Sequence, residues 1–306
     1  MTEKTFRHRQ VGRRAKTVIA SAVLALGFTA GLSDGASALT IVRNFTGGTA
    51  ATTTAGGGNL VSIFNAAADW WEMAIGDAFT VKLNFSWAAI GGGTLGDHTL
   101  VSQSGTPNRE TEGNIRFDNG TSWFLDSTPH SEEEFGPMQT SSEDFGGGVI
   151  NTGRWFNAVA FDALNRYDLL TVAKHEIGHS LGLSAANNAY KAETLLNNKI
   201  NVTPPRPFAG SVIPTTNPNP VGTGFNAHLP IGTGSTGALM FPSLDKGVRK
   251  IQSAVDILAN CQVSQFVNCN LDPQHVPEPA TMLLFGIGLV GLGAASRRRR
   301  ATALAA

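Results

Sequence analysis

The sequence predicts an α+β domain, because helical and strand-like patterns of apolar residues alternate along the same stretch of chain. Apolar residues recur at helical spacing from Leu60 to Ala74, and a second helical segment spans residues 163–183. Between them, residues 79–87 (FTVKLNFSW) alternate apolar and polar side chains, as a half-buried strand does. We therefore expect a twisted sheet, two long helices above a cleft, and a less regular C-terminal part.

Three further strands are predicted before the second helix. A strand-like run, LTIVRNF, begins at Leu39, and a loop rich in Gly and Thr follows it up to residue 58. Residues 113–118 and 121–125 are predicted as two strands joined by an Asn-Gly turn, which is a strong hairpin signal. Residues 126–148 are polar and acidic and end in three glycines, so we expect a loop there.

The second helix and the segment after it differ sharply in composition. Asp168 or Asn165 could cap the second helix. Residues 184–238 are rich in Asn, Pro, Gly and Thr, and a long irregular stretch of this kind inside a domain is usually functional. A final helix is predicted with one apolar face, made by Ile251, Val255 and Leu258.

The N-terminus is predicted to be a signal peptide, residues 1–38. Basic residues precede an apolar run at 17–32, and Ala36-Ser37-Ala38 fits the small-x-small pattern that signal peptidase cleaves. A membrane anchor is the alternative, but the apolar run is short for a span and the cleavage pattern follows it. Arg13-Arg14 fits a twin-arginine signal poorly.

The C-terminus resembles the PEP-CTERM sorting signal of Gram-negative bacteria. Residues 276–300 contain Val-Pro-Glu-Pro, a glycine-rich apolar stretch at 280–296 and four arginines, in that order. The apolar stretch is predicted to be a transient transmembrane anchor, with the arginines on the cytoplasmic side. The resemblance implies processing by an exosortase-type enzyme; an ordinary C-terminal anchor is the alternative. The body, residues 39–275, would then be exported to the periplasm, the outer surface or the medium.

Charge and cysteine usage fit an exported body. Residues 39–276 hold 13 Lys or Arg against 20 Asp or Glu, a net charge of −7, which argues against a nucleic-acid partner. Cys261 and Cys269 are close in sequence, so we expect a disulfide in an oxidising compartment. The acidic run Glu132–Glu134 is predicted to be a solvated surface without a calcium site.

Residues 174–182, KHEIGHSLG, carry the strongest chemical signal in the sequence. On a helix, His175 and His179 lie one turn apart on the same face, so both imidazoles can reach one Zn²⁺. Glu176 projects beside them and is suited to act as general base towards a zinc-activated water. Gly178 and Gly182 would weaken a purely structural helix.

A catalytic zinc site needs a third protein ligand, which the helix does not supply. In the commonest form of this motif a third histidine follows six residues after the second, but that position is Ala185 here. His8 falls within the signal peptide, His275 adjoins the sorting signal, and His98 and His130 precede the helix. His228, followed 12 residues later by Met240, is the remaining candidate.

These features together resemble the metzincins, and among them the leishmanolysin-like branch. The resemblance rests on HEIGHSLGL, a distant histidine and ALMFP at 238–242. The resemblance implies a metzincin-like zinc-protease domain in which 184–238 is an insertion before the third ligand, His228. It also implies that Met240 forms the methionine turn beneath the metal. The insertion is short for that branch, and its typical cysteines are missing.

We therefore expect a secreted or cell-surface zinc-dependent endopeptidase that acts on polypeptides. His175, His179 and His228 would hold Zn²⁺, and Glu176 would be the catalytic base. The first alternative is a non-catalytic surface or extracellular-matrix protein that keeps the fold. A second is zinc-dependent hydrolysis of a substrate other than peptide.

Overall fold

The computed structural model describes residues 38–273 except 197, 217–226 and 234–235. The predicted sorting signal with its span at 280–296, and residues 1–37 of the predicted signal peptide, lie outside the described residues. Among the described helices, none is long and apolar enough to cross a membrane.

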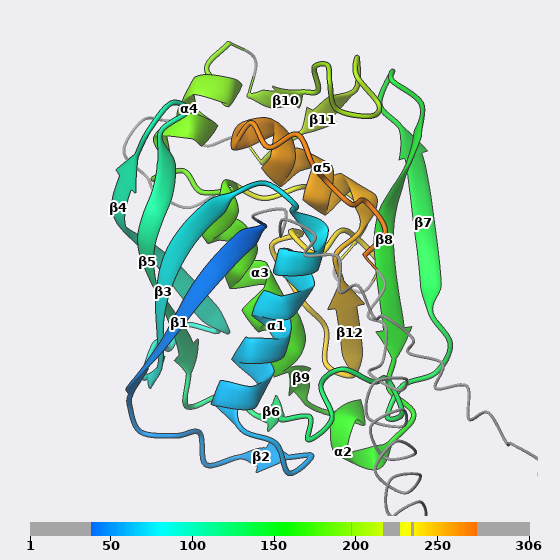
Figure 1. Cartoon of the computed structure of the whole chain (residues 1–306). Helices are drawn as coiled ribbons and strands as arrows, with labels where there is room; N and C mark the ends of the chain where they lie inside the picture. The colour runs from blue at the N-terminus through cyan, green and yellow to red at the C-terminus, as the bar shows by residue number, and fades with distance from the viewer. Residues whose placement is uncertain (1–37, 197, 217–226, 234–235, 274–306) are drawn as a thin grey trace, which may run out of the picture. The chain divides into compact units, whose positions relative to one another are not determined.

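A four-stranded sheet forms one layer of the domain (Figure 1). Its order is β1 (Leu39–Gly47), β3 (Phe79–Ala88), β5 (Arg109–Asp118) and β4 (Gly96–Ser104). β1, β3 and β5 run parallel, and β4 pairs antiparallel with β5. β4 therefore lies at one edge of the sheet. This strand was not predicted, because its sequence is mostly polar.

The hairpin predicted around the Asn-Gly turn is wrong. β5 pairs with β3 and β4, whereas residues 121–125 contribute β6 (Trp123–Phe124) to a separate small sheet. In that sheet β6 lies between β2 (Thr54–Ala55) and β9 (Tyr167–Asp168), parallel to both. Both side chains of β6 are buried, and a hairpin strand with one solvent face would leave one of them exposed.

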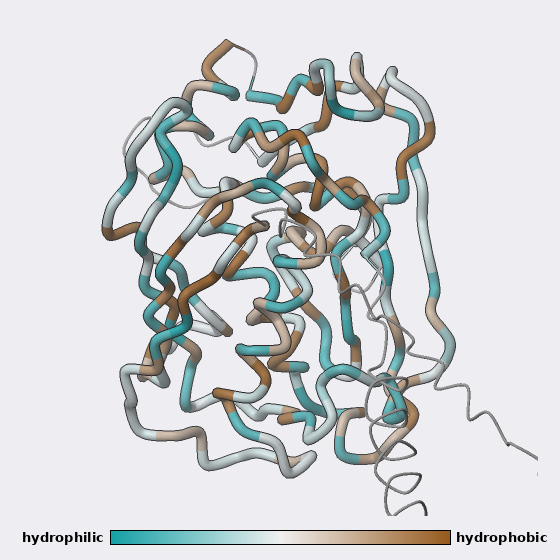
Figure 2. Tube along the Cα trace, viewed as in Figure 1, coloured by the Kyte–Doolittle hydropathy of each residue, from teal (hydrophilic) through white to brown (hydrophobic). Residues whose placement is uncertain are grey.

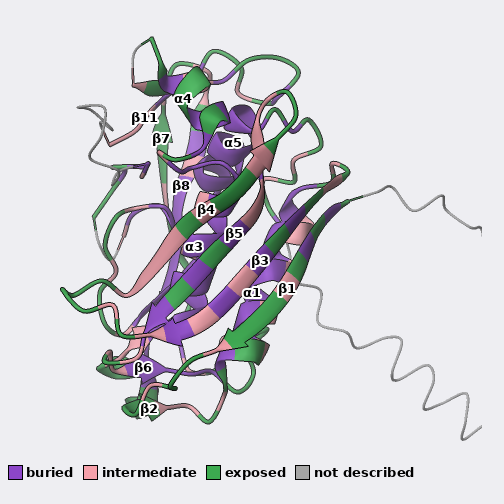
Figure 3. Ribbon diagram, turned by 90° about the vertical axis from the view of Figure 1, so that its left-hand side faces the viewer, coloured by how far each residue is buried: buried purple, intermediate pink, exposed green. Residues whose placement is uncertain are grey.

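One face of the main sheet is covered by helices and the other is open. Figure 3 shows buried and more exposed residues alternating along β3, whose inward residues are Val81, Leu83, Phe85 and Trp87. The hydropathy of the chain alternates in the same way along these strands (Figure 2). The period-two pattern thus fixes which face of the sheet receives the helices.

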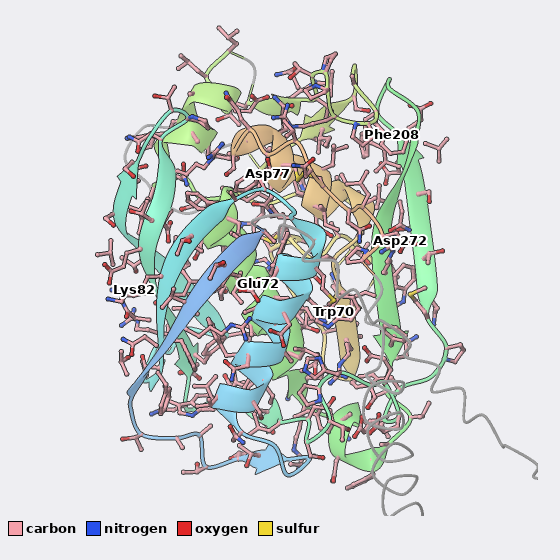
Figure 4. The ribbon with its side chains drawn as sticks, in the orientation of Figure 1. Trp70, Glu72, Asp77, Lys82, Phe208 and Asp272 are labelled. Atoms are coloured by element: carbon pink, nitrogen blue, oxygen red, sulfur yellow. A yellow bond between two sulfur atoms is a disulfide. The ribbon has the colours of Figure 1, made fainter. Side chains whose placement is uncertain are left out.

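Helix α1 (Leu60–Ala74) packs on this face beside β1. The Asn59 side chain caps its start by accepting a hydrogen bond from the Ser62 amide at 3.0 Å. Glu72, labelled in Figure 4, accepts from the Ile41 amide at 2.7 Å and pairs with Arg43 at 2.5 Å. These contacts attach α1 to the first strand, and α1 in turn packs against α3 (Leu169–Leu181).

A second layer contains an antiparallel sheet of three strands, β7 (Gln139–Asp144), β8 (Val149–Asn157) and β12 (Val248–Ile251). β7 falls inside residues 126–148, which were predicted to be a loop. That prediction is wrong because β7 gains its order from pairing with β8, although its own side chains are mostly exposed. A short helix, α2 (Phe161–Leu164), follows β8.

The segment predicted to be irregular holds small elements between loops. They are α4 (Asn188–Thr194), β10 (Lys199–Asn201) and β11 (Val212–Pro214). The last helix, α5 (Ala254–Val263), is buried along its whole length. Cys261 on α5 is bonded to Cys269 in a disulfide.

Candidate metal centre

Helix α3 places the two motif histidines and the glutamate between them. The helix begins at Leu169 and not near residue 163, and its cap is Asp168 rather than Asn165. The Asp168 carboxylate accepts from the Thr171 amide at 3.0 Å and from the Thr171 hydroxyl at 2.7 Å. Capping at this point fixes where the helix starts and therefore which way His175 faces.

Three imidazole rings converge at one point. The ring centroids are 4.7 Å apart for His175 and His179, 5.2 Å for His175 and His228, and 4.9 Å for His179 and His228. One ring nitrogen from each lies within 4.8 Å of the other two, with no other group of this kind among the described residues. The structure thus brings together the two neighbouring histidines and the distant one.

Hydrogen bonds orient the two helical rings. Nδ1 of His175 donates to the Leu239 carbonyl at 2.8 Å, and Nδ1 of His179 donates to the Leu183 carbonyl. With both Nδ1 atoms used as donors, the Nε2 atoms face each other at 3.1 Å with their lone pairs. Two facing lone pairs are stable when a cation lies between them.

All three imidazoles are held in the neutral form that binds metals. Burial lowers the pKa of His179 to about 4 and that of His228 to about 3, and neighbouring histidines add to the effect at His228. Burial also lowers the pKa of His175 well below its usual value. Nδ1 of His228 is buried and has no hydrogen-bond partner among the described residues. Three neutral imidazoles, two of them oriented by hydrogen bonds, fit a tetrahedral Zn²⁺ with one open position.

The distant histidine is attached to the turn that contains Met240. The amide of Leu229, next to His228, donates to the Met240 carbonyl at 2.9 Å. The buried Asp256 carboxylate accepts from the amides of Leu239 at 3.1 Å and Met240 at 2.9 Å. Met240 is fully buried and packs against Gly178 of α3. Asp256 was not identified from the sequence, because its role depends on contacts 16 residues away.

Glu176 is nearly buried and points towards the edge strand. A Cβ placed on Gly96 would lie 3.1 Å from the Glu176 carboxylate, so the backbone of β4 passes directly over it. Burial raises the pKa of Glu176 to about 8, and Asp97 contributes in the same direction. The carboxylate is therefore close to the rings and poised to exchange a proton near neutral pH.

The rings and Glu176 open into a cavity of about 550 Å³. On one side the cavity is bordered by the start of β4, Gly96–His98. On the other side it is bordered by Phe241–Leu244, which follow the Met240 turn. An extended chain lying in this cavity would run beside the free edge of β4.

The contacts of two ionisable residues, His98 and Arg249, were not foreseen from the sequence. His98 on β4 lies 6.3 Å from His179 between ring centroids, and its Nε2 is 2.7 Å from the buried Glu110 carboxylate. Arg249 on β12 is fully buried and pairs with Asp126, Asp168 and Glu132. Glu132 therefore belongs to a buried ion-pair network, which corrects the prediction of a wholly solvated acidic run.

The matrixin family matches residues 71–203, and a PEP-CTERM protein-sorting motif matches residues 275–300. These two matches support a metzincin-like protease that carries a PEP-CTERM sorting motif. Comparisons with curated proteins and with solved structures found no match.

The matrixin match supports a zinc-dependent peptidase and a mixed α and β fold of the metzincin kind. The matched range contains α3 and ends before His228. The inclusion of His228 in the candidate site therefore rests on the geometry of the three rings alone. The sorting motif indicates export and sorting to the cell surface of a Gram-negative bacterium.

Proposed function

We propose that this protein is an exported zinc-dependent endopeptidase that holds its metal through His175, His179 and His228. The observation that carries the proposal is the convergence of three neutral imidazoles beside a buried glutamate in an open cavity. The matrixin similarity supports the same class of activity.

The reaction follows from the positions of these groups. A bound Zn²⁺ would lower the pKa of a coordinated water towards 7 and polarise the scissile carbonyl. Glu176 accepts the proton of the attacking water and then passes it to the leaving amine, a role that suits its raised pKa. The Met240 turn and the backbone carbonyls of Leu183 and Leu239 hold the ring orientations during the cycle.

The substrate we propose is an extended polypeptide. β4 is the edge of the main sheet, and Gly96–His98 border the cavity. A peptide that pairs with this edge would place a carbonyl beside the three rings. Its main-chain hydrogen bonds would supply binding that does not depend on sequence.

Replacing Glu176 by Gln tests the proposal. We expect cleavage of casein to fall by about 10²–10⁴-fold, because the amide cannot take the proton of water. Zinc content, measured by atomic emission, should stay near one ion per chain, since the three histidines remain. His228→Ala is the companion variant and should lose zinc.

The outcomes separate the proposal from a non-catalytic surface protein with the same fold. Wild-type protein that contains zinc but cleaves neither casein nor a mixed peptide library would favour the non-catalytic role. Full zinc binding by His228→Ala would remove His228 from the metal site.

We also propose that signal peptidase removes residues 1–38 and that an exosortase-type enzyme processes 276–300. Until that processing, residues 280–296 would anchor the chain in the membrane. The mass of the mature protein, released from cells, checks both cleavages.

A further inference from the structure

The cavity beside the metal centre has a cationic end. There it is lined by Thr171 and Val172 of α3, by the segment Phe241–Leu244 and by Lys250 of β12, which contacts Thr171. Side chains alternate along β12, so Arg249 enters the buried network while Lys250 lies on the other face. The side chain of Lys250 is 1% exposed overall.

The ammonium group of Lys250 is poorly compensated. Nζ donates to the Ala238 carbonyl at 3.2 Å and lies 5.5 Å from the centre of the Phe241 ring. Among the described residues, no carboxylate forms an ion pair with it. An ammonium carries three donors, so two remain for a ligand.

The two nearest acidic groups are occupied elsewhere or lie outside the cavity. Asp256 accepts hydrogen bonds from the backbone of the Met240 turn and from Ser253, and Asp245 is on the surface. Both raise the pKa of Lys250, but burial lowers it more, to about 8. Lys250 is therefore still positively charged at pH 7.

The position of Lys250 relative to Glu176 indicates which residue of the substrate Lys250 contacts. The Lys250 amide donates to the Thr171 hydroxyl at 2.8 Å, and Thr171 lies five residues before Glu176 on α3. His179 and Ser184 lie in the opposite direction along the chain. In the proposed reaction Glu176 protonates the leaving amine, so the Lys250 end of the cavity faces the residue that carries this amine.

We propose that Lys250 determines specificity by binding the carboxylate of an Asp or Glu side chain in the residue that follows the scissile bond. This inference rests on the proposed peptidase function. A buried ammonium without a counter-ion is costly, and a substrate carboxylate both neutralises it and accepts its two free donors. A neutral side chain would leave the charge unpaired.

A matched set of peptides tests the inference. The peptides are acetyl-Ala-Ala-Gly-X-Val-Ala-amide with X as Glu, Gln or Met, and product masses identify the bond that is cut. We expect kcat/KM with Glu to exceed that with Gln by about tenfold to one hundredfold, the range of a hydrogen bond between charged groups. Lys250→Met should reverse the order, and Lys199→Met, which removes an exposed ammonium from β10, should leave it unchanged.

Binding is measured separately from turnover. The Glu176→Gln protein loaded with zinc should bind the Glu peptide about tenfold or more tightly than the Gln peptide in calorimetry. Equal affinities, or a wild-type preference for Gln or Met, would overturn the role of Lys250. Preferential binding of Glu without any cleavage by the wild type would instead overturn the proposed peptidase. Because the wild-type comparison alone decides the point, the test survives if Lys250→Met fails to fold.

Discussion

Gly178 shows how one missing side chain shapes the metal centre. It lies on α3 between the two motif histidines, facing the Met240 turn. A Cβ there would lie 2.5 Å from Sδ of Met240 and 3.1 Å from the Trp71 ring. Trp71 is itself fixed by a hydrogen bond from Nε1 to the Lys174 carbonyl at 2.8 Å. The glycine is therefore needed for close packing of the Met240 turn and Trp71 against α3.

We predict that Gly178→Ala destabilises the protein, although alanine favours helices by about 1 kcal/mol. Overpacking at this site should lower the free energy of unfolding by about 1–3 kcal/mol in urea denaturation. The control is the double variant Gly178→Ala with Met240→Ala, in which the methyl group enters the vacated space. If the alanine costs as much in that background, Met240 is not what the glycine accommodates.

Strands β4 and β5 carry a buried base and acid, His98 and Glu110, beside the candidate metal centre. Burial raises the pKa of Glu110 to about 9 and lowers the pKa of His98 to about 4. The folded pair therefore keeps one proton between those pH values. In the unfolded chain the usual pKa values are 4.5 for Glu110 and 6.5 for His98. The unfolded pair therefore holds one proton only between pH 4.5 and pH 6.5.

The sign of the pH dependence follows from this difference. From pH 6.5 to about 9 the folded protein holds one proton more than the unfolded chain, so stability falls as pH rises. We expect a loss on the order of 1–3 kcal/mol across this range in urea titrations of zinc-saturated protein. Below pH 4.5 the folded and unfolded proteins differ little in the number of bound protons, so stability changes little with pH.

Glu110→Gln removes the titrating acid while keeping the shape of the side chain, and it should flatten the decline between pH 7 and 9. Glu112→Gln, an exposed carboxylate on the same strand, is the matched control and should retain the wild-type slope. An unchanged slope in Glu110→Gln would assign the decline to other groups.

At the scale of the whole molecule, the sequence predicted what is local and missed what depends on distant pairing. His175, Glu176 and His179 follow from helical spacing alone, and α1 and β3 follow from periodicity. His228 was selected by elimination and by resemblance, since no spacing rule connects it to α3. Its place depends on the bond between Leu229 and the Met240 turn, which is a tertiary contact.

The errors have the same physical origin. The Asn-Gly dipeptide indicated a hairpin, but burial of Trp123 and Phe124 directs the chain to another sheet. β7 carries few apolar residues, so its order comes from β8. Lys250 was not identified from the sequence, because nothing in its neighbourhood in sequence reveals the cavity that it lines.

The disulfide links the last helix to the end of the first. Cys269 forms a β-bridge with Ile75, and the amide of Asn270 donates to the Ala74 carbonyl at 2.8 Å. The bond to Cys261 thus attaches α5 to the segment that closes α1. Helix α5 also carries Asp256, which holds the Met240 turn from the opposite end of the helix.

We predict that replacing both cysteines by serine lowers the free energy of unfolding by about 2–3 kcal/mol, the loop-closure entropy for a separation of eight residues. Wild-type protein treated with dithiothreitol should lose the same amount, and the double variant should not respond to the reductant. Zinc content of the folded double variant should be unchanged, since Asp256 lies at the far end of α5 from Cys261. Loss of zinc at temperatures where the fold persists would mean that the disulfide, through α5, also sets the position of the Met240 turn.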